Sequence, residues 1–229
     1  MREISFPLLV VNFKTYGESA GDAAVGLAKV AEEVSLKLGV CVAVAPQLID
    51  LPRVVASVRI PVFAQHVDPY DPGPFTGHSS IQAVKQAGAA GSLVNHSEHM
   101  LRLSEIDQII QKMRRLGQVS LVCTNTAQVS AAVAALEPDI IAIEPPELIG
   151  TGVPVSKAKP EVVRDTVSLI RRINSKVQVL CGAGISRGED ASAARRLGTV
   201  GVLVSSGVVK AQDHLSTLTD LAEALKMQS

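Results

Sequence analysis

The residues best suited to chemistry in this 229-residue chain stand at the ends of short apolar runs. Glu144 directly follows Ile140–Ile143, which has the length and β-branched content of a strand buried on both faces. His96 and Lys14 come within three residues of the ends of two other apolar runs. A carboxylate can act as a base, an imidazole can donate or accept a proton, and an ammonium can stabilise negative charge. These three side chains could therefore move a proton and stabilise the charge that its removal leaves.

Two turns rich in glycine and serine add a second kind of chemistry. Gly184 follows the run Val177–Leu180, and Ser205 and Ser206 follow Val202–Val204. Because glycine and serine let other groups approach the backbone closely, the N–H groups of these turns could bind phosphate oxygens. Each candidate could also have no function: the Glu and Lys could be solvated surface side chains, the His could be structural, and the Gly and Ser residues could belong to ordinary loops. A fold that brings all of them to one place favours the functional interpretation.

Apolar runs alternate with helical patterns along the chain. We predict eight strands, at Leu8–Val11, Val40–Ala45, Val62–Ala64, Ser92–Val94, Val119–Val122, Ile140–Ile143, Val177–Leu180 and Val202–Val204. We predict helices at Asp22–Leu38, Ser80–Ala87, Ser104–Leu116, Ala127–Leu136, Glu161–Ile173, Asp190–Leu197 and Leu215–Lys226, with a turn or two within Leu48–Val58. Such alternation predicts βαβ units and a parallel sheet, and eight units predict an α/β protein of one domain, a (β/α)8 barrel over residues 1–229.

An open doubly wound sheet is the competing architecture. It normally carries a Gly-rich phosphate-binding sequence after its first strand, whereas Asn12-Phe-Lys14 stands there in this chain. No linker, charge block or low-complexity tract divides the sequence. In a barrel, the residues that follow each strand lie on one rim, where barrel enzymes place their active sites. The barrel therefore brings Lys14, His96, Glu144 and both Gly/Ser turns together.

The composition argues against several classes of protein. The 22 Lys and Arg residues balance 22 Asp and Glu residues, and aromatic residues make up only 3%, so a nucleic-acid surface is not expected. No run of apolar residues is long enough to span a membrane, and the first residues lack a signal-peptide pattern, which predicts a cytoplasmic protein. The three cysteines and the histidines lack metal-ligand spacing, so we expect no metal site. The 47% hydrophobic content predicts subunit interfaces in addition to a core.

Four segments, in chain order, resemble motifs of the triosephosphate isomerase family, and the short chain resembles its compact archaeal branch. They are Asn12-Phe-Lys14, Phe75-Thr-Gly-His-Ser79, Asn95-His-Ser-Glu98 and the lid segment Glu144-Pro-Pro-Glu-Leu-Ile-Gly-Thr-Gly152. The resemblance implies a TIM barrel that interconverts dihydroxyacetone phosphate and glyceraldehyde 3-phosphate through an enediolate, in glycolysis and gluconeogenesis. It implies no cofactor.

The resemblance also implies roles for individual residues in catalysis. Glu144 would be the base that moves a proton between C1 and C2, and His96 the electrophile that polarises the carbonyl oxygens. Lys14 would stabilise negative charge, with Asn12 contacting substrate beside it. Glu98 would orient Lys14.

Other residues would bind phosphate or join subunits. Ile149 in the lid, together with Gly184, Ser205 and Ser206, matches the family's phosphate and lid contacts. Thr76 would reach the active site of a neighbouring subunit. The expected assembly is a homo-oligomer, at least a dimer built on the Phe75–Ser79 loop and, in the compact archaeal form, a tetramer.

The chain departs from the family pattern at three points. Cys181-Gly-Ala-Gly184 stands where the family usually has Tyr-Gly-Gly-Ser, no Trp is present for the lid hinge, and Asn95 replaces a glycine. Two other functions remain alternatives. A sugar-phosphate epimerase would share the phosphate turns but normally needs paired acid and base residues or a metal. A non-catalytic scaffold should lack Lys14, His96 or Glu144, and all three are present.

Overall fold

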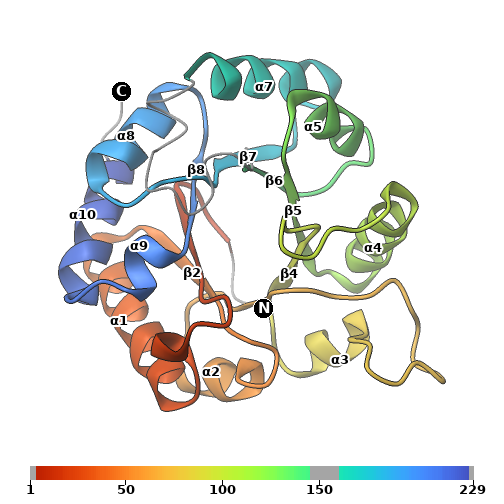
Figure 1. Ribbon diagram of the computed structural model, residues 1–229, viewed down its shortest axis with the longest axis horizontal. Helices are drawn as coiled ribbons and strands as arrows, with labels where there is room; N and C mark the ends of the chain where they lie inside the picture. The colour runs from red at the N-terminus through yellow and green to blue at the C-terminus, as the bar shows by residue number, and fades with distance from the viewer. Residues whose placement is uncertain (1–3, 145–159, 227–229) are drawn as a thin grey trace.

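Eight parallel strands form a barrel inside a ring of helices in the computed structural model, which describes residues 4–144 and 160–226 (Figure 1). The strands are β1 (Leu8–Asn12), β2 (Cys41–Ala45), β3 (Phe63–Ala64), β4 (Gly91–Val94), β5 (Val119–Thr124), β6 (Ile140–Ile143), β7 (Gln178–Cys181) and β8 (Gly201–Val204). Their order in the sheet is β2-β1-β8-β7-β6-β5-β4-β3. A parallel bridge between Val44 and Val62 joins β2 to the chain before β3 and closes the barrel. The predicted TIM barrel is confirmed; its extent as one domain over residues 1–229 stays a prediction.

Helices connect consecutive strands and cover the outside of the barrel (Figure 1). They are α1 (Asp22–Leu38), α2 (Leu51–Ser57), α3 (Ile81–Gln86), α4 (Leu103–Leu116), α5 (Ala127–Ala134), α7 (Pro160–Ile173), α8 (Gly188–Arg196), α9 (Ser206–Val209) and α10 (His214–Lys226). A 3-10 helix, η1 (Gly17–Ser19), lies between β1 and α1. Each predicted helix overlaps an observed one, but η1 and α9 were not predicted. Such short helices are shorter than one amphipathic repeat, so periodicity does not reveal them.

Some helix ends differ from the predicted ones because side chains cap them. Ser80, predicted to start a helix, instead precedes α3, and its Oγ accepts a hydrogen bond from the Ala83 backbone at 3.2 Å. Thr126 caps α5 in the same way through Val129, and α5 begins at Ala127 as predicted. At the other end of α5, the chain leaves the helix before Glu137, whose φ of 60° is left-handed. These local contacts stop the helices one or two residues short of their apolar patterns.

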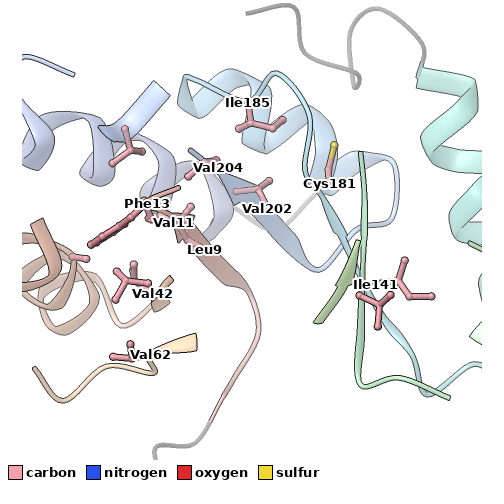
Figure 2. Packing of buried hydrophobic residues seen from close by; sticks show 14 of the residues in the cluster. Leu9, Val11, Phe13, Val42, Val62, Ile141, Cys181, Ile185, Val202 and Val204 are labelled. Carbon is pink, nitrogen blue, oxygen red and sulfur yellow. The ribbon is translucent and has the colours of Figure 1, made fainter. Parts of the chain in front are cut away.

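The strands bury side chains on both faces, which explains their continuous apolar sequences. An inner cluster that includes Leu8 and Val10 fills the barrel, while Leu9 and Val11 belong to a larger cluster between the strands and the helices. Figure 2 shows part of this outer layer, where Val11 is paired with Val204. Full burial of one aliphatic side chain contributes about 1.5–3 kcal/mol, so the two layers together stabilise the barrel. No helix in the described part of the chain is long and apolar enough to cross a membrane.

Candidate active site

A cavity of about 340 Å³ opens at the carboxyl ends of the strands. It is lined by Asn12, Lys14, Tyr16, His96, Glu144, Gly182, Gly184, Ile185, Ser186, Leu203, Val204, Ser205, Ser206 and Gly207. Most of the predicted site residues are therefore brought together from β1, β4, β6, β7 and β8. Glu98 lies beside this cavity through its contacts with Lys14 and His96. Ile149 lies outside the described residues.

Glu144 stands at the end of β6 with its side chain facing His96. Its backbone N–H donates to the Thr124 carbonyl at 2.8 Å, which continues the ladder between β5 and β6. The side chain is only 6% exposed, and Oε1 lies 3.6 Å from His96 Nε2. The other oxygen, Oε2, is buried without a hydrogen-bond partner among the described residues. A buried carboxylate with an unused oxygen can accept a proton or a hydrogen bond from a bound molecule.

Burial raises the pKa of Glu144 above its ordinary value. The nearby His96, the Cys123 thiol and Lys14 act in the opposite direction, and burial outweighs them. Desolvation therefore makes this carboxylate a stronger base than one in water, and Lys14 and His96 keep its ionised form accessible. A perturbed carboxylate in a cavity is typical of a catalytic group.

His96 is held in one tautomer by the loop that follows it. The backbone N–H of Glu98 donates to His96 Nδ1 at 3.2 Å, so Nδ1 is an acceptor and the proton is on Nε2. The His99 N–H donates to the His96 carbonyl at 2.7 Å and tightens the same turn. The result is a neutral imidazole whose Nε2–H points toward Glu144. Such a group can donate a hydrogen bond to a substrate oxygen.

Lys14 lies in a left-handed turn immediately after β1, with a φ of 48°. Its N–H donates to Asn12 Oδ1 at 2.9 Å, and its Nζ forms an ion pair with Glu98 Oε1 at 2.7 Å. Gln65 Nε2 donates to the Lys14 carbonyl at 2.9 Å and to the Ala45 carbonyl at 3.0 Å. No role was expected for Gln65, although its place directly after β3 could have indicated one. These contacts fix a positive charge at the edge of the cavity.

The two Gly/Ser turns line the cavity beside the loop of Lys14, because β8 pairs with β1 and β7 pairs with β8. Gly184 has a left-handed φ of 72°, which glycine adopts without strain. Ser205 Oγ is buried and has no hydrogen-bond partner within the described part of the chain. Gly207 packs against the other turn, because a β-carbon there would lie 3.0 Å from Ser186 Cα. The turns thus leave polar groups free to meet a ligand.

A buried carboxylate supports the turn that contains Ser186. Asp190 Oδ2 accepts hydrogen bonds from the backbone N–H groups of Ser186 at 3.2 Å and Arg187 at 3.1 Å. Asp190 was expected only as the first residue of the predicted helix Asp190–Leu197. Asp190 is the third residue after the N-cap Arg187, a pair that differs from the usual Ser/Thr and Glu/Gln capping pattern, so nothing local in the sequence indicated this role. The residue therefore positions the turn without facing the cavity.

Comparison with known proteins identifies the family. The family described as "Triosephosphate isomerase" matches residues 7–225 of this chain. The chain belongs to the triosephosphate isomerase family. Triosephosphate isomerase of Methanocaldococcus jannaschii is 53% identical over 214 residues, which cover 93% of this chain and 98% of that protein. The one from Methanothermus fervidus is 54% identical over 215 residues, covering 94% of this chain and 97% of that protein. The family resemblance seen in the sequence is confirmed.

Further residues that line this cavity were not predicted from the sequence, among them Tyr16 and Ser186. Tyr16 lines the cavity from the loop after β1, and Lys210 Nζ lies 4.4 Å from the centre of its ring. Lys210 follows α9, so this cation–π contact connects the loop of Lys14 with the turn of Ser205. Ser186 lines the cavity from the loop after β7. Their places next to predicted site residues were the only signal in the sequence.

Thr76 does not line this cavity in the single chain. It lies in an exposed loop, where Phe75 is 41% exposed and stacks on Tyr70 with ring centroids 4.4 Å apart. The same loop is anchored by Asp68, which accepts a hydrogen bond from the Ser79 N–H. Its predicted role in a neighbouring subunit's site therefore concerns an assembly rather than this chain alone. No cluster of three or more His, Cys, Asp or Glu side chains in residues 4–144 and 160–226 could hold a metal ion.

Proposed function

We propose that this chain interconverts dihydroxyacetone phosphate and glyceraldehyde 3-phosphate by proton transfer through an enediolate, in glycolysis and gluconeogenesis. The observation that carries the proposal is the pair at the centre of the cavity. A buried carboxylate, Glu144, faces the protonated Nε2 of a neutral His96 at 3.6 Å. Membership of the triosephosphate isomerase family supports the same reaction.

Glu144 is the proposed base. It removes a proton from C1 of dihydroxyacetone phosphate, and the electrons of the broken C–H bond form the C1–C2 double bond of the enediolate. The proton of the C1 hydroxyl passes to the C2 oxygen by way of His96. The protonated carboxyl group returns a proton to C2, and the C1–O bond becomes the aldehyde carbonyl. Burial suits this residue to the task, because desolvation raises the pKa of Glu144 and strengthens it as a base. Its unused Oε2 supports this role.

His96 and Lys14 are the proposed stabilisers of the enediolate oxygens. The Nε2–H of His96 donates to the oxygen on which negative charge develops, and Lys14 supplies a fixed positive charge nearby. A neutral histidine electrophile beside a glutamate base is already established for this enzyme family. The Glu98 N–H to Nδ1 contact supports that arrangement in this chain, because it leaves the proton on Nε2. Asn12 lines the cavity beside Lys14 and is proposed to contact substrate.

Gly184, Ser205 and Ser206 are proposed to bind the phosphate group. All three line the cavity from the loops after β7 and β8, and the unpaired Ser205 Oγ supports a polar ligand at that point. Phosphate binding would supply energy for orientation and lid closure rather than for the chemistry itself. Ile149 is proposed to join these contacts from the lid.

We further propose a homo-oligomer in the cytoplasm, a dimer joined through the Phe75–Ser79 loop and paired into a tetramer. Stacking of Phe75 on Tyr70 stiffens that loop, while part of the Phe75 ring stays exposed and available to a partner. Thr76 in this loop is proposed to reach the active site of the neighbouring subunit. Exposed apolar side chains elsewhere, including Ile49 and Met100, support further subunit contacts.

A coupled assay with dihydroxyacetone phosphate tests the function. We expect rapid formation of glyceraldehyde 3-phosphate without added metal, and inactivity would favour an epimerase or a non-catalytic scaffold. Glu144→Asp withdraws the carboxylate by one methylene and should lower kcat on the order of 10²-fold with little change in KM. Glu33→Asp on the exposed face of α1 is the matched control and should leave kcat unchanged. Near-normal turnover of Glu144→Asp would refute Glu144 as the base.

A further inference from the structure

Asn95 closes the loop that carries His96. Its side chain makes two hydrogen bonds of opposite kind, each 2.9 Å long. The Nδ2 group donates to the Cys123 carbonyl on β5, and Oδ1 accepts from the Leu101 N–H at the far end of the loop. One amide thus joins the first residue of the loop to its last turn and to the neighbouring strand.

The position of this amide follows from where the sheet ends. The β4–β5 ladder runs as far as the pair Val94 and Val122. Asn95 then turns into a left-handed conformation with a φ of 59°. Beyond the last strand pair, the side-chain Nδ2 of Asn95 donates to the carbonyl of Cys123, which is the next residue of β5 after Val122. The amide therefore replaces a backbone hydrogen bond of the ladder.

The strand residue that Asn95 holds is also a neighbour of the base. The Cys123 thiol interacts with the Glu144 carboxylate and counteracts the effect of burial on the pKa of Glu144. His96 follows Asn95 directly, and the loop that Asn95 closes contains the Glu98 N–H that fixes the His96 tautomer. The Asn95 side chain therefore contacts both the loop that holds His96 and the strand residue beside Glu144.

Few other residues could do this. Asparagine tolerates a left-handed backbone better than most residues with a β-carbon, and it carries both a donor and an acceptor. Glycine would adopt the backbone but would lose both hydrogen bonds. Aspartate would keep an acceptor for Leu101 and would place an anionic oxygen against the Cys123 carbonyl.

We propose that Asn95 is a positioning residue for catalysis, which sets the place of the His96 imidazole relative to Glu144. This inference rests on the proposed isomerase function. The residue does not line the substrate cavity, so its effect passes through His96 and the Glu98 N–H. Loss of its two hydrogen bonds should lower kcat more than it changes KM.

The test compares Asn95→Gly with wild type as the full-length protein. A displacement of about 1 Å can cost on the order of 10²-fold, so we expect kcat to fall roughly 10- to 100-fold with KM changed less than about threefold. The ¹⁵N chemical shifts of the His96 ring should move toward a mixture of tautomers, because the Glu98 N–H no longer holds Nδ1. A merely structural role would not move that signature. Asn174→Gly is the matched control, since Asn174 accepts one hydrogen bond from Lys176 at the other end of the barrel.

The outcomes separate this inference from the function on which it rests. Wild type without isomerase activity would refute the function, whatever the variants do. An active wild type with an unchanged kcat and unchanged His96 shifts in Asn95→Gly would refute the positioning role alone. If Asn95→Gly fails to fold, Asn95→Asp carries the test: a loss of kcat at least as large with shifted ring signals supports the role, and wild-type values overturn it.

Discussion

The side chain of Glu144 packs directly against the Cα of Gly182. A β-carbon on residue 182 would lie 2.6 Å from Glu144 Cγ and 3.2 Å from Oε1. The Gly182 N–H donates to the Ile143 carbonyl at 2.9 Å, which holds the two residues side by side. The φ of Gly182 is not left-handed, so its backbone would accept alanine, and the three atoms nearest to the added β-carbon all belong to Glu144. Gly182→Ala should displace the carboxylate from His96 and lower kcat on the order of 10²-fold. Overpacking should cost about 1–3 kcal/mol of unfolding free energy, measurable by denaturant titration.

Two further variants decide whether Glu144 causes these losses. Gly26→Ala in α1 is the control, because its β-carbon would meet nothing within 4 Å; it should keep kcat and gain about 0.5–1 kcal/mol. In a Glu144→Ala background the side chain that opposes residue 182 is gone. Gly182→Ala should then cost almost nothing in stability. An equal cost in both backgrounds would show that the strain lies elsewhere.

The raised pKa of Glu144 predicts a specific dependence of stability on pH. The folded state binds this proton more tightly than the unfolded state, whose ordinary value is 4.5. The free energy of unfolding therefore falls as pH rises from about 4.5 through the raised pKa, and the loss is complete above it. Glu144→Gln cannot ionise, so its stability relative to wild type should increase across that interval. Denaturant titrations at a series of pH values measure this difference, and a constant difference would contradict the assignment.

Lys14→Ala should abolish isomerase activity and leave the fold nearly intact. Its partner Glu98 is 58% exposed, and an ion pair of this kind contributes about 0–1 kcal/mol. The thermal midpoint should therefore change by only a few degrees. Arg114→Ala, which removes the pair with Glu137 at a distance of 3.3 Å, is the control and should keep full activity. A collapse of the thermal midpoint in Lys14→Ala would favour a structural role instead.

The proposed assembly predicts a particle larger than one chain. One chain has a mass of 24.0 kDa, so light scattering at micromolar concentration should report about twice or four times that value. Phe75→Ala removes the exposed ring and its stacking on Tyr70. The oligomer of this variant should therefore dissociate at a higher protein concentration than the wild-type oligomer when both are diluted. Leu36→Ala, on the exposed face of α1, is the control. A species of 24.0 kDa for wild type would refute the dimer and the tetramer together.

We expect the lid segment to protect the enediolate intermediate from losing phosphate. An enediolate next to a phosphate ester eliminates phosphate when the C–O bond to the phosphate aligns with the π system of the enediolate. A closed lid that binds the phosphate holds this bond in the plane and prevents elimination. Deleting Leu148–Thr151, which lie outside the described residues, should lower isomerase activity and increase the share of turnovers that release phosphate and methylglyoxal. Measuring phosphate release beside isomerisation gives the partition ratio. The same ratio in both proteins would show that this segment does not protect the intermediate.

Local sequence determined the strands and the rim they define. Strands such as Ile140–Ile143 are buried on both faces, so they must be apolar throughout. This apolar run can be recognised in the sequence without knowing which strands lie beside it. The residue that follows such a strand then falls on the rim by topology alone. That is why Lys14, His96 and Glu144 could be predicted as one group from sequence. The turns of Gly184 and Ser205 followed from the same rule.

Tertiary structure alone decided how those side chains are held. Gln65 reaches the Lys14 carbonyl across 51 residues, and Asn95 reaches Cys123 across 28. The contact of Gly182 with Glu144 depends on the register between β6 and β7. No local periodicity encodes such contacts, because they depend on which atoms strand pairing and packing bring within a few ångströms. The sequence by itself determined which groups reach the rim, and the packed barrel determined their distances, tautomer and burial.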